Sequence, residues 1–595
     1  MLRSRIFDNE VLEKPFNMGQ LKRLMAYLKP YRKQVVVTVI LMFISAFLGL
    51  LGPYILKIAI DDYMVQADYR GLAVLALIYS AGNAVIMIFN RQRIITMSQV
   101  GQKALYRIRQ DLFNHIQKLS FQFYDSRPAG KILVRIINDV NSLGDLLSNG
   151  IVNVLVDGVT IILVIVMMLS MNVALTLITL TVMPLMLIVI MGLKKVIRRR
   201  WQTVRKKASN MNGYLHESLA GMRVTQAFAR EPETNKVYNE LSHDIRSSWM
   251  SAIKVNNLMG PSSTIIATIS TVLVYWFGIS FIDSGVVTVG ILVAFASYVN
   301  RFWQPVNNIL NFINSILVAM ASTERIFELL DTPADIIDYP DAIEMPEIEG
   351  EVRFENLSFH YEPEKPVLKN INIQVTPGET IALVGPTGAG KSTMVNLLSR
   401  FYEPIEGRIL IDGMDINTVT MNSLRDQMGV MMQDSFIFSG TILDNIRYGK
   451  LDASDEEVKA AARVVYADEF IRNMEKGYYT EVKERGSRLS QGQRQLISFA
   501  RALLADPRIL ILDEATSSID TQTEILVQKG LNELLKGRTS FVIAHRLSTI
   551  RNADRIMYIE DGRIAECGSH DELLQLKGEY YKLYLSQYRF LDDVS

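Results

Sequence analysis

A glycine-rich turn that ends in a lysine and a serine is the most specific chemical signal in the sequence. It follows the apolar run Thr380–Val384 and precedes a helical stretch that includes Thr393. In the pattern GxxxxGK[ST], backbone N–H groups and a helix N-terminus face phosphates, the lysine neutralises the β- and γ-phosphates, and the hydroxyl ligates Mg²⁺. We therefore predict that a nucleoside triphosphate binds here with Mg²⁺. The turn consists of Gly385, Pro386, Thr387, Gly388, Ala389, Gly390, Lys391 and Ser392.

Two carboxylates end a second apolar run. Ile509–Leu512 leads directly into Asp513 and Glu514. Ligands of open α/β sheets bind at the carboxyl ends of the strands, so this pair is expected near the bound nucleotide. Asp513 is suited to hold Mg²⁺, and Glu514 is suited to polarise an attacking water as a general base. Alone, such a pair could be surface charge; together with the glycine-rich turn it predicts nucleotide hydrolysis.

The elements that must position these residues are typical of an α/β domain. Short β-like runs alternate with helical stretches over residues 350–595, which predicts a largely parallel sheet. The acidic stretch 326–349, with its three prolines, is interpreted as a linker before this domain. The predicted strands are Ile371–Val375, Thr380–Val384, Arg408–Ile411, Ile509–Leu512, Ser540–Ile543 and Arg555–Ile559.

The apolar residues concentrate in the first 320 residues or so. Six runs there approach the roughly 20 apolar residues that a helix needs to cross a bilayer. One such run could be a buried helix of a large soluble domain, but six with almost no charges predict an α-helical membrane domain over 34–325. Residues 1–33 are an N-terminal arm, in which Met18–Lys33 resembles an interfacial helix. The six runs are Val35–Ile60, Gly71–Phe89, Ile151–Leu169, Val173–Leu193, Thr264–Ile282 and Val286–Phe312.

Lysines and arginines indicate the orientation in the membrane. They are frequent in the N-terminal arm and in the long connections after the second and fourth runs, and scarce in the short connections. The positive-inside rule then places both termini and the α/β domain in the cytoplasm, with the chain in the cell membrane. The long connections are expected to extend the membrane helices into the cytoplasm. Their turn-like tips, Phe123–Lys131 and Glu217–Arg223, are expected to touch a cytoplasmic domain.

Composition excludes several other classes of protein. Apolar residues make up 49% of the chain and there are only 17 prolines, which excludes a disordered or collagen-like protein. The single cysteine, Cys567, excludes an intrachain disulfide framework and a cysteine-rich zinc site. A net charge of +1 gives no reason to expect a nucleic acid partner.

A third motif, Leu489-Ser490-Gln491-Gly492-Gln493, resembles the LSGGQ signature of ABC transporters. The glycine-rich turn, the Asp-Glu pair and this motif stand in that family's order. The six apolar runs and the two long connections resemble a bacterial ABC half-exporter of the multidrug-resistance type. By resemblance, Tyr361 stacks on adenine, Gln433 belongs to the Q-loop and helps hold Mg²⁺, Asp520 belongs to the D-loop, and His545 is the catalytic switch histidine beside Glu514.

The resemblance implies ATP and Mg²⁺ as cofactors and a dimer of half-transporters. Ser490, Gln491, Gly492 and Gln493 of one chain would face the ATP bound to the other, since one P-loop holds the nucleotide from one side only. ATP binding and hydrolysis would drive alternating access of a central cavity. The expected activity is ATP-driven export of hydrophobic or amphipathic compounds. A lipid or peptide exporter is the alternative within the family, and an ATP-gated channel or regulatory subunit is the alternative outside it.

The signature departs from the family pattern at one position. Gln491 replaces the usual second glycine, which is either a tolerated variant or the mark of a heterodimer with one impaired ATP site. In a heterodimer this chain would supply the complete catalytic residues, and its altered signature would serve the weaker site. Lys483 replaces a glycine in a segment that resembles TEVGERG, so altered coupling is a further expectation.

Two charges inside the apolar runs point to a substrate cavity. Asp157 and Arg301 fall at similar depths, and we expect them to face water and to pair; a purely structural ion pair is the alternative. Tyr298, Phe302 and Trp303 surround Arg301 at helical spacing. They would suit a pocket for amphipathic aromatic cations, although aromatic residues at this spacing also simply pack helices together.

Overall fold

The computed structural model describes residues 18–592 except 284, 433–434, 484–485, 514–520 and 545–546. They form two compact units. The membrane unit runs to Gln117 and resumes over Ala129–Asp331, and the ATPase unit comprises Lys118–Pro128 and the chain from Thr332 onward. Residues 123–128 of the predicted tip therefore belong to the ATPase unit, whereas residues 129–131 belong to the membrane unit.

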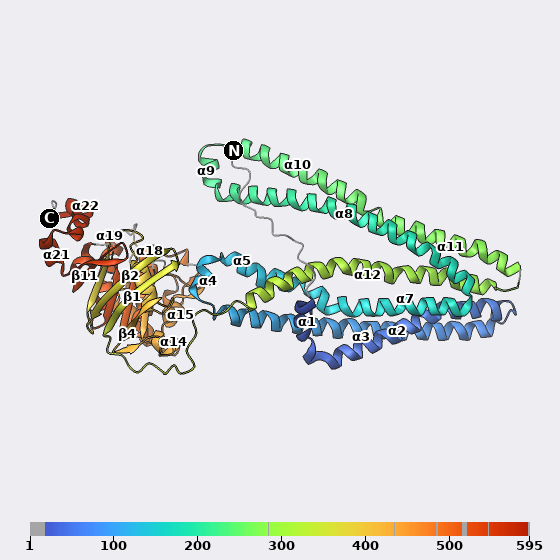
Figure 1. Cartoon of the computed structure of the whole chain (residues 1–595), viewed down its shortest axis with the longest axis horizontal. Helices are drawn as coiled ribbons and strands as arrows, with labels where there is room; N and C mark the ends of the chain where they lie inside the picture. The colour runs from blue at the N-terminus through green and yellow to red at the C-terminus, as the bar shows by residue number, and fades with distance from the viewer. Residues whose placement is uncertain are drawn as a thin grey trace. The chain divides into compact units, whose positions relative to one another are not determined.

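The membrane unit is entirely helical in its described residues (Figure 1). Polar residues begin its long helices: the side chains of Asp68, Asn172 and Thr288 accept hydrogen bonds from backbone N–H groups of the first turns of α3, α8 and α12. Asp68 and Asn172 lie in two of the short connections, and Thr288 lies just after the third, near the start of the sixth predicted run. The elements are α1 (Met18–Ala26), η1 (Lys29–Tyr31), α2 (Arg32–Ile58), η2 (Ala59–Met64), α3 (Tyr69–Ile116), α5 (Ala129–Val134), η3 (Arg135–Asp139), α6 (Val140–Ser142), η4 (Leu146–Gly150), α7 (Ile151–Met171), α8 (Val173–Ala220), α9 (Met222–Ala227), α10 (Glu231–Asn256), α11 (Met259–Asp283) and α12 (Val289–Leu330).

Five helical stretches of the described chain are long and apolar enough to cross a membrane, and they carry the first five predicted runs. The sixth run lies in α12, a helix of 42 residues that is not among those five. The difference arises because Asn300, Arg301 and Gln304 interrupt its apolar stretch. The longest helices extend well beyond the apolar runs, as expected for helices that continue out of the bilayer.

The ATPase unit contains two main sheets. One has four strands in the order β2-β1-β4-β5 with antiparallel pairing, and the other has six in the order β12-β11-β3-β10-β9-β6, parallel except at β12. Four predicted strands lie in the parallel sheet, whereas Ile371–Val375 and Arg408–Ile411 belong to the antiparallel one, which was not anticipated. The strands are β1 (Val352–Glu362), β2 (Lys365–Val375), β3 (Thr380–Val384), β4 (Glu406–Ile411), β5 (Met414–Asp415), β6 (Met428–Met431), β7 (Gly440–Thr441), β8 (Glu481–Val482), β9 (Ile509–Asp513), β10 (Thr539–Ile543), β11 (Arg555–Glu560) and β12 (Arg563–Gly568).

Two apolar clusters fill the ATPase unit, one including Phe354, Leu383 and Met394 and the other including Phe499, Leu510 and Val542. Alternate residues of β3, β9 and β10 contribute to the two clusters, so the parallel sheet is buried on both sides, as its continuous apolar runs predict. The helices of this unit are α4 (Phe121–Ser126), α13 (Lys391–Leu398), α14 (Met421–Arg425), α15 (Ile442–Arg447), α16 (Asp455–Val464), α17 (Asp468–Arg472), η5 (Gly477–Tyr479), α18 (Gln491–Ala505), α19 (Thr521–Leu535), α20 (Leu547–Asn552), α21 (His570–Leu576) and α22 (Glu579–Asp592).

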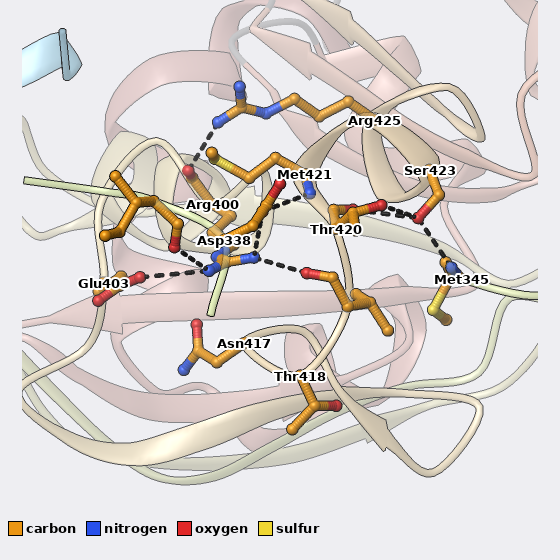
Figure 2. Close-up of polar contacts among 12 residues, drawn as sticks. Asp338, Met345, Arg400, Glu403, Asn417, Thr418, Thr420, Met421, Ser423 and Arg425 are labelled. Carbon is orange, nitrogen blue, oxygen red and sulfur yellow. Dashed lines mark hydrogen bonds and ion pairs between the residues drawn. The ribbon is translucent and has the colours of Figure 1, made fainter. Parts of the chain in front are cut away.

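The stretch interpreted as a linker has two parts with different surroundings. Residues 326–330 continue α12, whereas residues 337–349 are attached to the ATPase unit. The fully buried guanidinium of Arg400 donates to the carbonyls of Ile337 (3.1 Å) and Val419 (2.8 Å), and Asp338 accepts from the N–H of Met421 at 2.8 Å (Figure 2). Farther along, the N–H of Met345 donates to the Ser423 hydroxyl (2.7 Å). We call residues 337–349 the strap.

Candidate functional site

The glycine-rich turn joins β3 to α13 in the conformation that its glycines permit. Gly385, Gly388 and Gly390 have φ values of 147°, 83° and 109°, in the region that favours glycine. A Cβ on Gly385 would also lie 2.1 Å from the backbone oxygen of Ile559, so no other residue fits there without displacement of β11. The turn thus passes close to the backbone of β11 at Gly385 and ends at Gly390, the N-cap of α13.

Lys391 occupies the centre of this turn. Its ammonium donates to the carbonyls of Gly385 (2.7 Å) and Pro386 (2.9 Å), and the side chain is buried. Burial lowers the pKa of the Lys391 ammonium, and the nearby charge of Asp513 acts in the opposite direction. A cation held in this way is available to exchange its carbonyl partners for phosphate oxygens.

Ser392 and Asp513, two of the three residues predicted to bind Mg²⁺, follow strands that end at the same edge of the sheet. Asp513 ends β9, two strands from β3 in the sheet order, and is only partly buried; Ser392 is exposed in the first turn of α13. The parallel register of β3, β10 and β9 places Asp513 at the edge of the sheet from which the turn emerges. A hydroxyl and a carboxylate are oxygen donors of the kind that Mg²⁺ prefers, so the residues present fit the ion.

Four predicted residues lie outside the described residues: Gln433, Glu514, Asp520 and His545. In the sequence, Glu514 directly follows β9, and Gln433 and His545 come two residues after the ends of β6 and β10. The strands β6, β9 and β10 are neighbours in the parallel sheet and end at one edge, the edge of the glycine-rich turn. The roles of these four residues therefore stay predictions.

Tyr361, near the end of β1, presents an aromatic surface beside the turn. Its ring is exposed, and its hydroxyl lies 3.2 Å from that of Thr393 in α13. Phe359 and Tyr402 support the ring by edge contacts, with centroids 4.9 Å and 5.1 Å from that of Tyr361. An exposed, supported ring tied to the phosphate-facing helix is what stacking on a base requires.

The signature residues begin α18. The hydroxyl of Ser490 accepts from the N–H of Gln493 (3.2 Å), and the amide oxygen of Gln493 accepts from the N–H of Ser490 (3.0 Å). This capping box makes Ser490 the N-cap, with Gln491 as the first helical residue and Gly492 buried behind it. The helix N-terminus carries partial positive charge, which favours an anion.

Lys483 is exposed just after β8.

Asp157 and Arg301 are not brought together. Among the ion pairs of the described residues none joins them: Arg301 donates to the carbonyl of Gly49 in α2 (2.5 Å), and Asp157 accepts from the amide of Asn308 (3.3 Å). The expectation of a pair is therefore corrected. Its reason lies in Pro53, which has no N–H and so leaves the carbonyl four residues earlier, that of Gly49, without its helical partner.

The aromatic residues around Arg301 are packed inside the helix bundle. Tyr298, Phe302 and Trp303 are 0%, 3% and 5% exposed and belong to the apolar cluster of the membrane unit. The Tyr298 hydroxyl donates to the carbonyl of Leu50 (2.7 Å), next to the carbonyl that Arg301 contacts. Helix packing thus accounts for these three residues. The sequence signal that could have revealed this contact is a proline in one apolar run, Pro53, together with an arginine in another, Arg301.

Both halves of the chain match known protein families. Residues 35–306 match the ABC transporter transmembrane region, and residues 368–517 match the ABC transporter family. The chain is 44% identical to the uncharacterized ABC transporter ATP-binding protein YknV of Bacillus subtilis (strain 168), over 98% of this chain and 96% of that protein. It is 39% identical to YgaD of the same strain, provisionally named a multidrug export ATP-binding/permease protein, over 96% of this chain and all of YgaD.

Two further similarities bear on fold and substrate. An ATP-dependent lipid A-core flippase of Syntrophus aciditrophicus (strain SB) is 36% identical over 96% of this chain and 95% of its own length. A solved structure of a bacterial Atm1-family ABC exporter with ATP bound is 30% identical, with a TM-score of 0.78 over 94% of this chain and 98% of that one.

The chain belongs to the ABC exporters: it is a half-transporter with an N-terminal membrane domain and a C-terminal ABC ATPase domain. The predictions of family, fold class and enzyme class are confirmed. The protein is a membrane protein that binds ATP and couples its hydrolysis to transport. ABC exporters work as dimers, so the two signature-bearing helices of a functional complex come from two chains.

Proposed function

We propose that the protein exports hydrophobic and amphipathic small molecules from the cell, across the cell membrane, as a multidrug exporter. The observation that carries the substrate class is the placement of Arg301 and Asp157. Arg301 in α12 is exposed and Asp157 in α7 is half-buried, so polar side chains stand on two helices whose other residues are mostly apolar. Similarity to YgaD, provisionally named for multidrug export, supports the same class.

The basic arm and long connections favour an orientation with both termini and the ATPase unit in the cytoplasm. Substrate then enters a cavity that faces the cytoplasm or the inner leaflet. Two ATP molecules bring two ATPase units together, and the change is relayed to the membrane helices. Outward opening, release and hydrolysis complete the cycle.

The chain's own residues divide the work of hydrolysis. Lys391 exchanges its carbonyl partners for phosphate oxygens, and the N–H groups of residues 385–392 hold the remaining charge. Ser392, Asp513 and Gln433 would hold Mg²⁺, which when bound neutralises phosphate charge. Glu514 polarises the attacking water, and His545 contacts the γ-phosphate from the neighbouring strand end. Tyr361 stacks on adenine.

A heterodimer is the proposed assembly. Gln491 places a long polar side chain at the first position of α18, where the family's glycine leaves the backbone uncovered. This signature would serve the weaker ATP site of a complex whose partner has a defective catalytic carboxylate. Purification of the native complex should recover a second half-transporter of that kind. Recovery of this chain alone, as a dimer with full ATPase activity, would exclude the proposal.

Transport into inverted membrane vesicles tests the export function. With ATP, vesicles that contain the native complex should accumulate a fluorescent amphipathic dye against its gradient. Glu514→Gln should abolish accumulation and steady hydrolysis while nucleotide binding persists. ATP-dependent conductance without accumulation would instead indicate a channel. Movement of lipid alone would indicate a lipid exporter, the alternative that similarity to a lipid A-core flippase supports.

A further inference from the structure

The segment Lys118–Pro128 of the first long connection is part of the ATPase unit and is bonded to its other residues. α4 is a helix of six residues within Lys118–Pro128. The ring of Phe121 packs on that of Phe401 (centroids 4.3 Å apart), and the hydroxyl of Ser120 donates to Asp335 at 3.0 Å. A further polar contact is made by the hydroxyl of Tyr402, which donates to Asp125 at 2.5 Å.

Tyr402 is a buried tyrosine whose hydroxyl reaches an exposed carboxylate. Its side chain is 6% exposed, whereas Asp125 is exposed on α4. Burial, reinforced by the hydrogen bond to Asp125, raises the pKa of the Tyr402 phenol above its usual value. The hydroxyl therefore stays protonated and donates throughout the physiological pH range. A neutral donor on a charged acceptor makes a stronger hydrogen bond than a neutral pair does.

The other end of Tyr402 lies against the aromatic residue expected to stack on the nucleotide base. The rings of Tyr402 and Tyr361 meet edge to face, with centroids 5.1 Å apart and planes at 89°. Phe359 contacts both rings, at 4.9 Å from Tyr361 and 5.7 Å from Tyr402. Phe359 and Tyr402 are buried, and interior packing restricts their movement, so the exposed ring of Tyr361 can tilt only away from them unless they move with it.

We propose that Tyr402 is a positioning residue that links the base-stacking ring of Tyr361 to Asp125 in α4, so that occupancy of the adenine position is transmitted to the first long connection. The proposal rests on the proposed function, in which Tyr361 stacks on adenine and ATP drives export. A base stacked on Tyr361 fixes the orientation of that ring. The fixed ring sets the position of Tyr402, and the hydroxyl of Tyr402 holds α4. The base, and not only the phosphates, then contributes to coupling.

Tyr402→Phe tests this link because it keeps the ring and removes only the hydroxyl. The matched control is Tyr478→Phe, which removes the hydroxyl of another buried tyrosine, one that donates to Asp468 at 2.6 Å and contacts neither Tyr361 nor α4 residues in the described hydrogen bonds and ring pairs. Wild type and variants are reconstituted as the native complex in proteoliposomes. Dye transported per nucleotide hydrolysed is then measured with ATP and with UTP, whose smaller base stacks less strongly.

In wild type, ATP should give a higher transport ratio than UTP. Tyr402→Phe should lower the ATP ratio by about fivefold or more, to the value with UTP, as expected from loss of one hydrogen bond to a charged group. Asp125→Asn should act similarly, and the double variant should be no worse than either single one. Tyr478→Phe should keep the wild-type ratios.

Other results overturn the link. A wild-type ATP ratio in Tyr402→Phe, or additive losses in the double variant, would show that the hydroxyl does not couple base to α4. If Tyr402→Phe impairs folding, the exposed Asp125→Asn variant decides alone. Absence of any ATP-driven uptake by wild type would instead refute the proposed export function, so the two failures are distinguishable.

Discussion

The guanidinium of Arg301 in α12 donates to the carbonyl of Gly49 in α2, the carbonyl that Pro53 leaves without a helical partner. The neighbouring carbonyl, that of Leu50, receives the hydroxyl of Tyr298. Within a bilayer an unpaired carbonyl is costly, since no water is present to bond it. Arg301, which the sequence suggests as a substrate ligand, thus also donates a hydrogen bond to a backbone carbonyl of α2 that would otherwise lack a partner.

Removal of this contact should cost stability. Arg301→Met keeps the length and apolar stem of the side chain but leaves the Gly49 carbonyl unpaired. We expect the free energy of unfolding in detergent to fall by about 1–2 kcal/mol. The thermal unfolding midpoint of the purified complex measures the change.

Pro53→Ala is the informative second variant. The N–H of the new alanine can bond the Gly49 carbonyl within α2, so Arg301→Met should cost less in this background than in wild type. An equal cost in the two backgrounds would contradict the assigned role of Arg301.

The glycine-rich turn should not accept a side chain at Gly385. Gly385→Ala creates both a strained φ and a clash with the backbone oxygen of Ile559, so nucleotide binding should be lost. Gly378→Ala is the matched control: its φ of 79° is also positive, but a Cβ there meets nothing within 4 Å. It should cost about 1 kcal/mol through strain alone and retain binding. Titration with a fluorescent ATP analogue distinguishes the two, and equal affinities would show that the clash is relieved.

The strap should be needed for the stability of the ATPase unit. Asp338→Ala removes the acceptor for the Met421 N–H and the acidic neighbour of buried Arg400, so unfolding should become easier by about 2 kcal/mol. Asp341→Ala, at an exposed position of the same strap, is the control. Hydrogen exchange of the backbone N–H groups of residues 343–349 should accelerate in Asp338→Ala only. Unchanged exchange in both variants would exclude a role for Asp338 in holding the strap.

Acidification should release α1 from the end of α12. Arg23 donates two hydrogen bonds of 2.7 Å to Asp331, and this contact lowers the pKa of the Asp331 carboxyl. A carboxyl with a lowered folded-state pKa contributes stability that is present above its unfolded pKa, near 4, and is lost as pH falls through the folded value. Proteolysis near residue 26 should therefore increase below about pH 4 in wild type. Asp331→Asn should show the increase already at pH 7, and a pH-independent wild type would refute the contact's role.

Local patterns predicted the strand, turn and helix of the proposed nucleotide site well, because the residues of each element lie close together in sequence. The turn from Gly385 to Ser392 and the strand before Asp513 carry their own conformational signals, glycines for positive φ and apolar runs for buried strands. The parallel sheet then brings them together without further information. The pattern could not distinguish strands of the antiparallel sheet from strands of the parallel one. Ile371–Val375 looks like any other short apolar strand until its partner in β1 is known.

Contacts between residues that lie far apart in the sequence could not be predicted from it. Arg301 and Asp157 lie at similar depth, which suggested a pair, but rotation about the helix axis decides which residue each one meets. The strap looked like a linker because it is acidic and proline-bearing; its attachment depends on Arg400 and Ser423, which lie far along the chain. Tyr402 belongs to no motif and was not predicted. Asp125 lies in the predicted tip Phe123–Lys131, but the sequence did not indicate its partner.

The strap also determines where an isolated ATPase domain must begin if it is to fold by itself. A truncated domain that starts at Glu351 keeps every strand but deprives the fully buried guanidinium of Arg400 of the Ile337 carbonyl and of Asp338. One that starts at Thr332 keeps them and follows the boundary between the two units. The shorter domain should aggregate on expression, while the longer one should stay soluble. The N-terminal boundary of a stable ATPase domain therefore lies well before β1.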